Sequence, residues 1–212
     1  GWFGFNAGSS LAGGDLRIGV IATNTMLASA SGAFFAMLYM WMFYGKPDIS
    51  MAANGLLAGL VAITAPCAFV NSVSAVIIGA VAGVLLCMSV FFVERRLRID
   101  DPVGAISVHG VNGAWGLLSL GLFADGTYGD GLNSVAGTVK GLFYGDASQF
   151  LAQIVGVITN FVFVFVVMYV FFTILNKIVP LRVSEEVEIE GLDQSEVAVT
   201  AYPDFSIHKT HR

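Results

Sequence analysis

Residues 100–116 read DDPVGAISVHGVNGAWG, and this stretch decides how the rest of the chain is interpreted. It opens on two acidic residues and a proline, and continues without Asp, Glu, Lys or Arg as far as Ala124. After these two aspartates, the one ionisable side chain before Ala124 is the imidazole of His109. If the stretch spans a membrane, His109 lies within the bilayer, where such a group is costly and usually marks a pathway or a proton relay.

The composition indicates a membrane protein. Of the 212 residues, 56% are hydrophobic and only 12% are charged, whereas a soluble domain carries about 25% charged residues. The 25 glycines suit a bundle of membrane helices, because small residues let helices approach closely. No basic patch accompanies the net charge of −5, so no nucleic-acid partner is predicted. Cys67 and Cys87 lie in apolar runs and are expected to be buried free thiols.

Uncharged runs predict a series of membrane-spanning helices, since about 20 apolar residues cross a bilayer. The fold class predicted is an all-α helix bundle, because the short alternating strands of a membrane barrel are absent from the pattern. Residues 1–14 look like the end of a further helix, and the residues after Pro180 form a polar tail. The predicted spans are residues 18–45, about 52–68, about 73–93, about 102–123 and 147–176.

Two further patterns concern packing and orientation. Gly79 and Gly83 lie four residues apart in the 73–93 span, which is a pattern typical of close helix contacts. Basic residues concentrate in the loops on one side, and the positive-inside rule places that side, with the C-terminal tail, in the cytoplasm. The group assigned to the cytoplasm is Lys46, Arg95, Arg96, Arg98, Lys177 and Arg182, and the opposite group is Arg17 and Lys140.

His109 is the first candidate for function. A neutral imidazole offers one donor and one acceptor, which suits the guidance of a small neutral polar molecule or a proton relay. The alternative is a structural histidine that hydrogen-bonds a neighbouring helix.

Phe5 and Ser9 are the second candidates, because they lie one helical turn apart on the same face. A hydroxyl above an aromatic ring suits the capture of a small cation followed by a dry gate. The alternative is an aromatic belt at the membrane interface. Residues 124–131 lack the ligand pattern of an EF-hand, and His208 and His211 look solvated. No catalytic residue, metal site or cofactor is predicted.

Several segments together resemble the ammonium transporter family (Amt/MEP, related to the Rh proteins). They cover nearly the whole chain in the family's order. The segments are GWFGFNAGS (1–9), ITAPCAFV (63–70), IGAVAG (78–83), DDPVGAISVHGVNG (100–113) and LRVSEEVEIEGLD (181–193). The chain has no initiator Met, and we interpret it as the later part of a longer protein or as one half of a split one.

The resemblance implies a fold of eleven transmembrane helices in two inverted halves, assembled as a homotrimer with a pore in each subunit. It implies that residues 1–183 hold the end of helix six and helices seven to eleven, and that residues 184–212 form a cytoplasmic regulatory tail. The first half, with a second pore histidine, is missing. Many relatives carry an acidic residue where this chain has Gly104, which is a departure near the cytoplasmic end.

The function implied by the resemblance is ammonium transport across the cell membrane, not enzyme catalysis. Ser9 matches the serine of the outer ammonium site, Phe5 matches a phenylalanine of the pore gate, and His109 matches a pore histidine. Ammonium is deprotonated, and ammonia passes a hydrophobic, His-lined pore with proton relay. Implied partners are ammonium or ammonia, membrane lipid and a PII-type signal protein at the tail. Two alternatives stay open, namely an ammonium sensor that signals through its tail and a passive ammonia channel.

Overall fold

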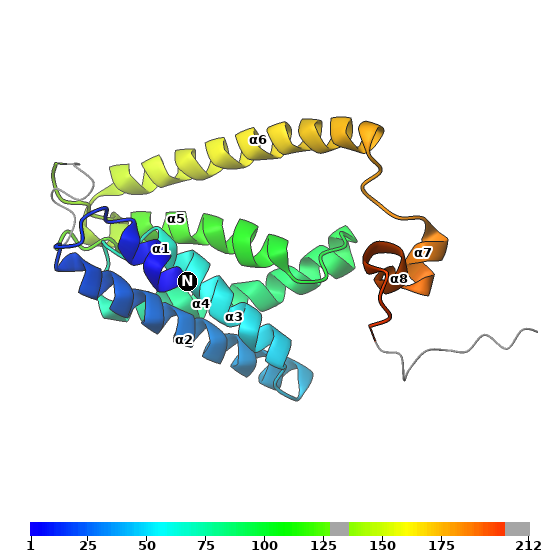
Figure 1. The fold of residues 1–212 in the computed structure, drawn as a ribbon. Coiled ribbons are helices and arrows are strands. Elements are labelled where there is room, and N and C mark those ends of the chain that lie inside the picture. The colour runs from blue at the N-terminus through cyan, green and yellow to red at the C-terminus, as the bar shows by residue number, and fades with distance from the viewer. Residues whose placement is uncertain (128–135, 202–212) are drawn as a thin grey trace, which may run out of the picture. The chain divides into compact units, whose positions relative to one another are not determined.

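The structure is a computed structural model that describes residues 1–127 and 136–201. It divides into two compact units, Gly1–Asn160 and Phe161–Arg212, and its regular structure is nearly all helical, which confirms the predicted class (Figure 1). The elements are α1 (Trp2–Gly8), α2 (Arg17–Tyr44), α3 (Ile49–Thr64), α4 (Ser72–Phe92), the π-helical η1 (Val93–Leu97) and η2 (Ile106–Val111), α5 (Asn112–Phe123), the 3-10 turn η4 (Leu142–Tyr144), α6 (Ala147–Ile178), α7 (Glu185–Glu190) and α8 (Leu192–Val197).

Among the described residues, four helical segments are long and apolar enough to cross a membrane. They correspond to predicted spans, with ends that differ by a few residues. They are Arg17–Tyr44, Ser72–Leu97, Ile106–Phe123 and Ala147–Ile178. The remaining predicted span, 52–68, corresponds to the shorter α3 of 16 residues.

The starts of two helices differ by three or four residues from their approximate predicted positions, and in both cases an aspartate side chain explains the difference. α3 begins before residue 52 because Asp48 accepts a 2.9 Å hydrogen bond from the backbone N–H of Met51 and so caps the helix. The helix that carries His109 begins after residue 102, because Pro102 lies in a turn and Asp101 caps the segment that follows it.

Small residues form the contacts among α2, α3 and α4. A Cβ atom added to Gly79 of α4 would lie 2.2 Å from the carbonyl oxygen of Ala28, and one added to Gly83 would lie 2.3 Å from that of Gly32. The predicted packing role of these two glycines is therefore confirmed. α3 uses the same device, since a Cβ on Gly59 would lie 2.2 Å from the carbonyl oxygen of Ala28. The three helices lie side by side in Figure 1.

The core of the first unit is built from short aliphatic side chains around these contacts. Cys67 and Cys87 are buried and unpaired thiols, as predicted. The buried apolar cluster is Ile21, Ala28, Ala58, Ala62, Ile63, Cys67, Ala68, Val70, Ala75, Ile78, Ala82, Leu86, Val90 and Val108.

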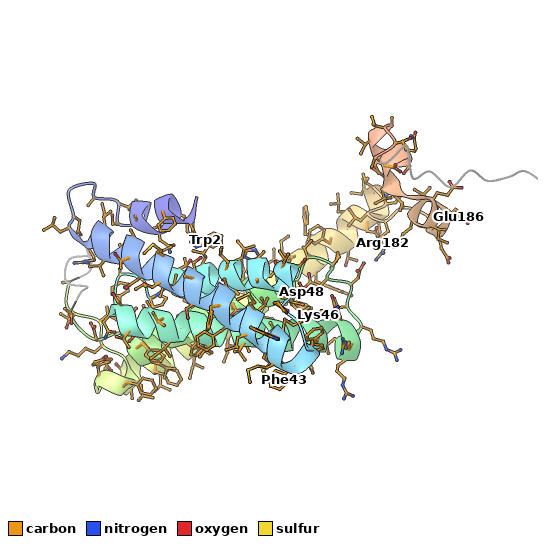
Figure 2. All side chains as sticks on the ribbon, turned by 90° about the horizontal axis from the view of Figure 1, so that it is seen from below. Trp2, Phe43, Lys46, Asp48, Arg182 and Glu186 are labelled. Atoms are coloured by element: carbon orange, nitrogen blue, oxygen red, sulfur yellow. The ribbon has the colours of Figure 1, made fainter. Side chains whose placement is uncertain are left out.

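One end of the first unit carries aromatic and basic side chains together. The rings of Tyr44 and Phe91 stack with centroids 4.7 Å apart, and the Arg95 guanidinium lies 4.5 Å from the Phe91 centroid. The C-terminal ends of α2 and α4 therefore meet. Figure 2 shows Lys46 and Asp48 at the adjoining turn between α2 and α3.

The opposite end of the first unit is tied by polar contacts. Nδ2 of Asn71 lies 3.4 Å from a carboxylate oxygen of Asp125 and 3.3 Å from the hydroxyl of Tyr144. The backbones of Asp125 and Lys140 also form an isolated antiparallel β-bridge. The loop charges of this unit thus separate between two ends as the sequence predicts, whereas the side that faces the cytoplasm stays a prediction.

In the described part of the second unit, the two short helices α7 and α8 follow α6. Ser184 caps α7 through the backbone N–H of Val187, and Arg182, labelled in Figure 2, pairs with Glu188, whose carboxylate lies 3.4 Å away. The pKa of Asp193 lies below its ordinary value, mainly because its carboxylate accepts a hydrogen bond from the backbone N–H of Ala201. His208 and His211 lie outside the described residues. The predicted boundary between residues 183 and 184 stays a prediction.

Candidate functional site

His109 lies on η2, and its side chain is exposed. The neighbouring Gly110 faces open space, because a Cβ added there would meet nothing within 4 Å among the described residues. The imidazole is therefore accessible on one side of a segment that is long and apolar enough to cross a membrane.

The start of the histidine segment is fixed by Asp101. Its two carboxylate oxygens accept from the backbone N–H groups of Ala105, at 2.8 Å, and Ile106, at 3.0 Å. Gly104 precedes them with a φ of +69°, a left-handed conformation that glycine adopts without steric cost. Asp101 thus satisfies two backbone donors that a helix start leaves unpaired. The sequence did not single out Asp101 for this role.

The histidine segment is bonded to α4 at two points. The hydroxyl of Ser107 donates to the hydroxyl oxygen of Ser89 at 2.8 Å. The indole N–H of Trp115 donates to the backbone carbonyl of Ile78 at 3.1 Å. Ser107 and Trp115 lie on either side of His109 along the chain, so contacts with one neighbouring helix hold both sides of the turn.

Phe5 and Ser9 lie on and just after α1. The Phe5 ring is 60% exposed and contacts the Trp2 ring edge-on, with centroids 6.1 Å apart. The Ser9 hydroxyl is exposed and donates to the backbone carbonyl of Phe5 at 2.7 Å. Its proton is thereby engaged, while its oxygen still has lone pairs that can accept a hydrogen bond from a cation.

α1 is held against its neighbours by two contacts that the sequence analysis missed. The indole N–H of Trp2 donates to the hydroxyl of Thr64 on α3 at 2.8 Å. Figure 2 shows the position of Trp2, which belongs to α1. Nδ2 of Asn6 donates to the hydroxyl of Thr25 on α2 at 3.0 Å. Asn6 was visible as a polar residue in an apolar run, which is a general signal for a buried hydrogen bond.

The structure does not join the three predicted residues into one cluster. Ser9 and Phe5 are linked by their hydrogen bond, whereas within the described part of the chain no hydrogen bond or ring contact joins His109 to either of them. They are therefore two separate groups, one on α1 and one on η2, both exposed.

Comparison with known proteins gives a consistent result. The model of the Ammonium Transporter Family matches residues 1–202. Ammonium transporter Amt2 of Archaeoglobus fulgidus is 49% identical over 210 residues, which cover 99% of this chain and 44% of the relative. An ammonium transporter of Bacillus subtilis is 40% identical over 205 residues, which cover 96% of this chain and 49% of the relative.

Solved structures agree with these relatives. A protein described as a Sensor Amt Protein is 38% identical and superposes with a TM-score of 0.79, covering 92% of this chain and 45% of its own. Mep2 of Saccharomyces cerevisiae is 29% identical with a TM-score of 0.78, covering 87% of this chain and 41% of its own.

These matches define the class as a polytopic helical membrane protein. The chain belongs to the ammonium transporter family. It spans about half the length of the curated relatives it matches.

Proposed function

We propose that this chain forms half of a path that carries ammonium across a membrane. In this proposal Ser9 belongs to the outer ammonium site, Phe5 to the gate, and His109 to the pore and its proton relay. The observation that supports it most is the exposed imidazole of His109 within an apolar, membrane-length segment of a chain that belongs to the ammonium transporter family.

The division of labour follows from the cost of moving a charge. An unpaired ion costs tens of kcal/mol in a medium of low dielectric constant, whereas a neutral polar molecule costs far less. A selective path therefore captures the cation where water is present, separates the proton, and passes ammonia through the dry part. The Ser9 oxygen serves the first step as a hydrogen-bond acceptor, and His109 serves the last as a partner for neutral ammonia.

We propose further that the exposed sides of α1 and η2 are covered by the half of the family fold that this chain does not span. Three glycines support this, because Cβ atoms at Gly4, Gly8 and Gly110 would meet nothing within 4 Å among the described residues. We call the two halves together the complete transporter. The eleven-helix inverted repeat, the homotrimer, the second histidine and the cytoplasmic position of the tail belong to this proposal.

The proposal is tested by reconstituting the complete transporter in liposomes and recording the current that an ammonium gradient drives. An ammonium-dependent current with rejection of K⁺ supports it. Ammonia flux without current indicates the passive channel. Ammonium binding with neither current nor ammonia flux indicates a sensor.

The sensor is a second candidate, because one structural neighbour is described as a Sensor Amt Protein. If the protein is a sensor, or if a PII-type protein binds to the tail, the tail transmits the signal. Deletion of residues 184–212 is then expected to change transport or its nitrogen-dependent shut-off. If the deletion changes neither, the regulatory role of the tail is refuted.

A further inference from the structure

We propose that Asn112 is the positioning residue for His109. It clamps the π-helical turn that carries the histidine and thereby fixes the direction in which the imidazole leaves the helix. The inference rests on the proposed function, since it explains how a pore histidine keeps its orientation before substrate arrives.

Asn112 contacts the turn through both its backbone and its side chain. Its backbone N–H points to the carbonyl oxygens of Ser107 and His109. Its Nδ2 donates to the same Ser107 carbonyl at 2.9 Å. A bond from residue 112 to residue 107 joins residues five positions apart, so it closes a π-helical turn rather than an α-helical one, in which the bonded residues are four positions apart. Asn112 therefore makes the closing bond twice.

The π-helical turn matters because it changes the register of the helix. An α-helix turns by roughly 100° for each residue, and a π-helical turn accommodates one residue more than an α-helical turn. Reversion to α-helical pairing would shift the register by one residue and rotate one side of the turn by roughly 100° against the other. His109 lies inside the turn, so its side chain would point elsewhere.

Contacts with α4 hold the helix on both sides of this turn, so the register between the two contacts depends on Asn112. Ser107 is bonded to Ser89 on one side of His109, and Trp115 is bonded to the carbonyl of Ile78 on the other. With both sides held, the extra residue must be accommodated between them. Asn112 lies between these two anchors, directly at the end of η2.

The side chain of Asn112 is poorly explained by stability alone. It is fully buried, and among the described residues nothing donates to its Oδ1 atom, which makes its burial costly. The Ser107 carbonyl already accepts from the Asn112 backbone N–H, so the side chain is not required to satisfy it. A role in fixing the geometry of the π-helical turn accounts for a buried side-chain amide whose Nδ2 donates a hydrogen bond while its Oδ1 accepts none among the described residues.

The test uses the complete transporter with His109→Ala, Asn112→Ala and, as a matched control, Ser119→Ala. Ser119 is also fully buried and donates to a carbonyl of its own helix, that of Gly116 at 2.8 Å, but it lies outside the π-helical turn. The readouts are the ¹⁵N NMR signals of the His109 ring, identified by their loss in His109→Ala, and the ammonium-driven current per folded transporter.

We expect Asn112→Ala to move the His109 signals and to reduce the maximal current about 10- to 100-fold, because small misplacements of an active group cost rates of this order. The apparent affinity for ammonium should stay unchanged, since capture occurs at Ser9. Ser119→Ala should change neither readout. Unmoved His109 signals in folded Asn112→Ala would overturn the proposal, as would equal effects in Ser119→Ala.

Two further outcomes separate this inference from the proposed function. If His109→Ala leaves the current unchanged, the proposed function fails, while the NMR signals still decide whether Asn112 orients the ring. If Asn112→Ala does not assemble, Asn112→Leu fills the site with an apolar side chain that cannot donate, and moved His109 signals in it support the proposal. Failure of both variants to fold overturns it in favour of a structural role.

Discussion

The hydroxyl of Ser9 donates a 2.7 Å hydrogen bond to the backbone carbonyl of Phe5, one helical turn earlier. This bond connects the residue proposed for ammonium capture to the residue proposed for the gate. It also determines what Ser9 can offer a ligand, because its proton is engaged and only the oxygen lone pairs remain. An acceptor of this kind can accept a hydrogen bond from an N–H group of an ammonium ion.

Ser9→Ala removes this acceptor. We expect the apparent Kd for ammonium to rise about tenfold with an unchanged maximal current, because a hydrogen bond to a charged group contributes roughly 1.5–3 kcal/mol and 1.4 kcal/mol corresponds to tenfold. The measurement is the concentration dependence of the current through the complete transporter. Ser10→Ala is the control, since Ser10 makes a similar bond to the Ala7 carbonyl at 2.8 Å but is buried. Equal effects of the two substitutions would argue against an ammonium site at Ser9.

Phe5→Ala opens the proposed gate. The ring is largely exposed and is held by one edge-on contact with Trp2, so its removal should leave a gap rather than unfold α1. We expect the rejection of K⁺ to weaken, measured as K⁺ current at fixed voltage. Phe3→Ala is the matched control, because Phe3 is 48% exposed on the same helix. Wild-type flux and wild-type K⁺ rejection in Phe5→Ala would argue against the gate.

Gly79→Ala is expected to destabilise the bundle. The added Cβ would lie 2.2 Å from the Ala28 carbonyl oxygen, and overpacking of a close contact costs about 1–3 kcal/mol of unfolding free energy. Reversible unfolding in detergent measures the change. Gly19→Ala in α2 is the control, because its Cβ would meet nothing within 4 Å, and the alanine should raise the stability by up to about 1 kcal/mol. Equal stabilities for the two variants would contradict the packing assigned to α2 and α4.

The tail contact of Asp193 should depend on pH. Its pKa is lowered in the folded state by the hydrogen bond from the Ala201 backbone N–H, so the stabilisation is present above the ordinary aspartate pKa of about 4. It is lost as the pH falls through the lowered folded-state value. Hydrogen exchange of the Ala201 amide, corrected for its intrinsic pH dependence, should show this loss. Asp193→Asn should abolish the dependence, and protection that does not fall at any pH below the ordinary aspartate pKa would contradict the assignment.

The sequence predicts the long helices well, because the length of an uncharged run determines whether a segment crosses a membrane. α4 and α6 agree with their predicted ends to within a few residues. The start of α3 differs by three residues from its approximate predicted position, because an uncharged run does not reveal which neighbouring side chain caps a helix. Gly79 and Gly83 were predictable from their spacing alone, but their partners, Ala28 and Gly32, were not.

Less of the candidate site was predictable. His109 stands out as an ionisable group in an apolar run, but the bond that anchors one side of its π-helical turn joins Ser107 to Ser89, 18 residues away. The contact of Trp2 with Thr64 joins residues 62 positions apart. Neither pairing leaves a periodic pattern in the sequence. Asn112 was visible only as one more polar residue near the histidine.

Participation of His109 in ammonium transport is tested by His109→Ala in the complete transporter. The decisive measurement is the ammonium-driven current together with the K⁺ current in the same liposomes. We expect the substitution to abolish the ammonium current or to remove the rejection of K⁺. An unchanged ammonium current together with unchanged K⁺ rejection would show that His109 has no part in transport.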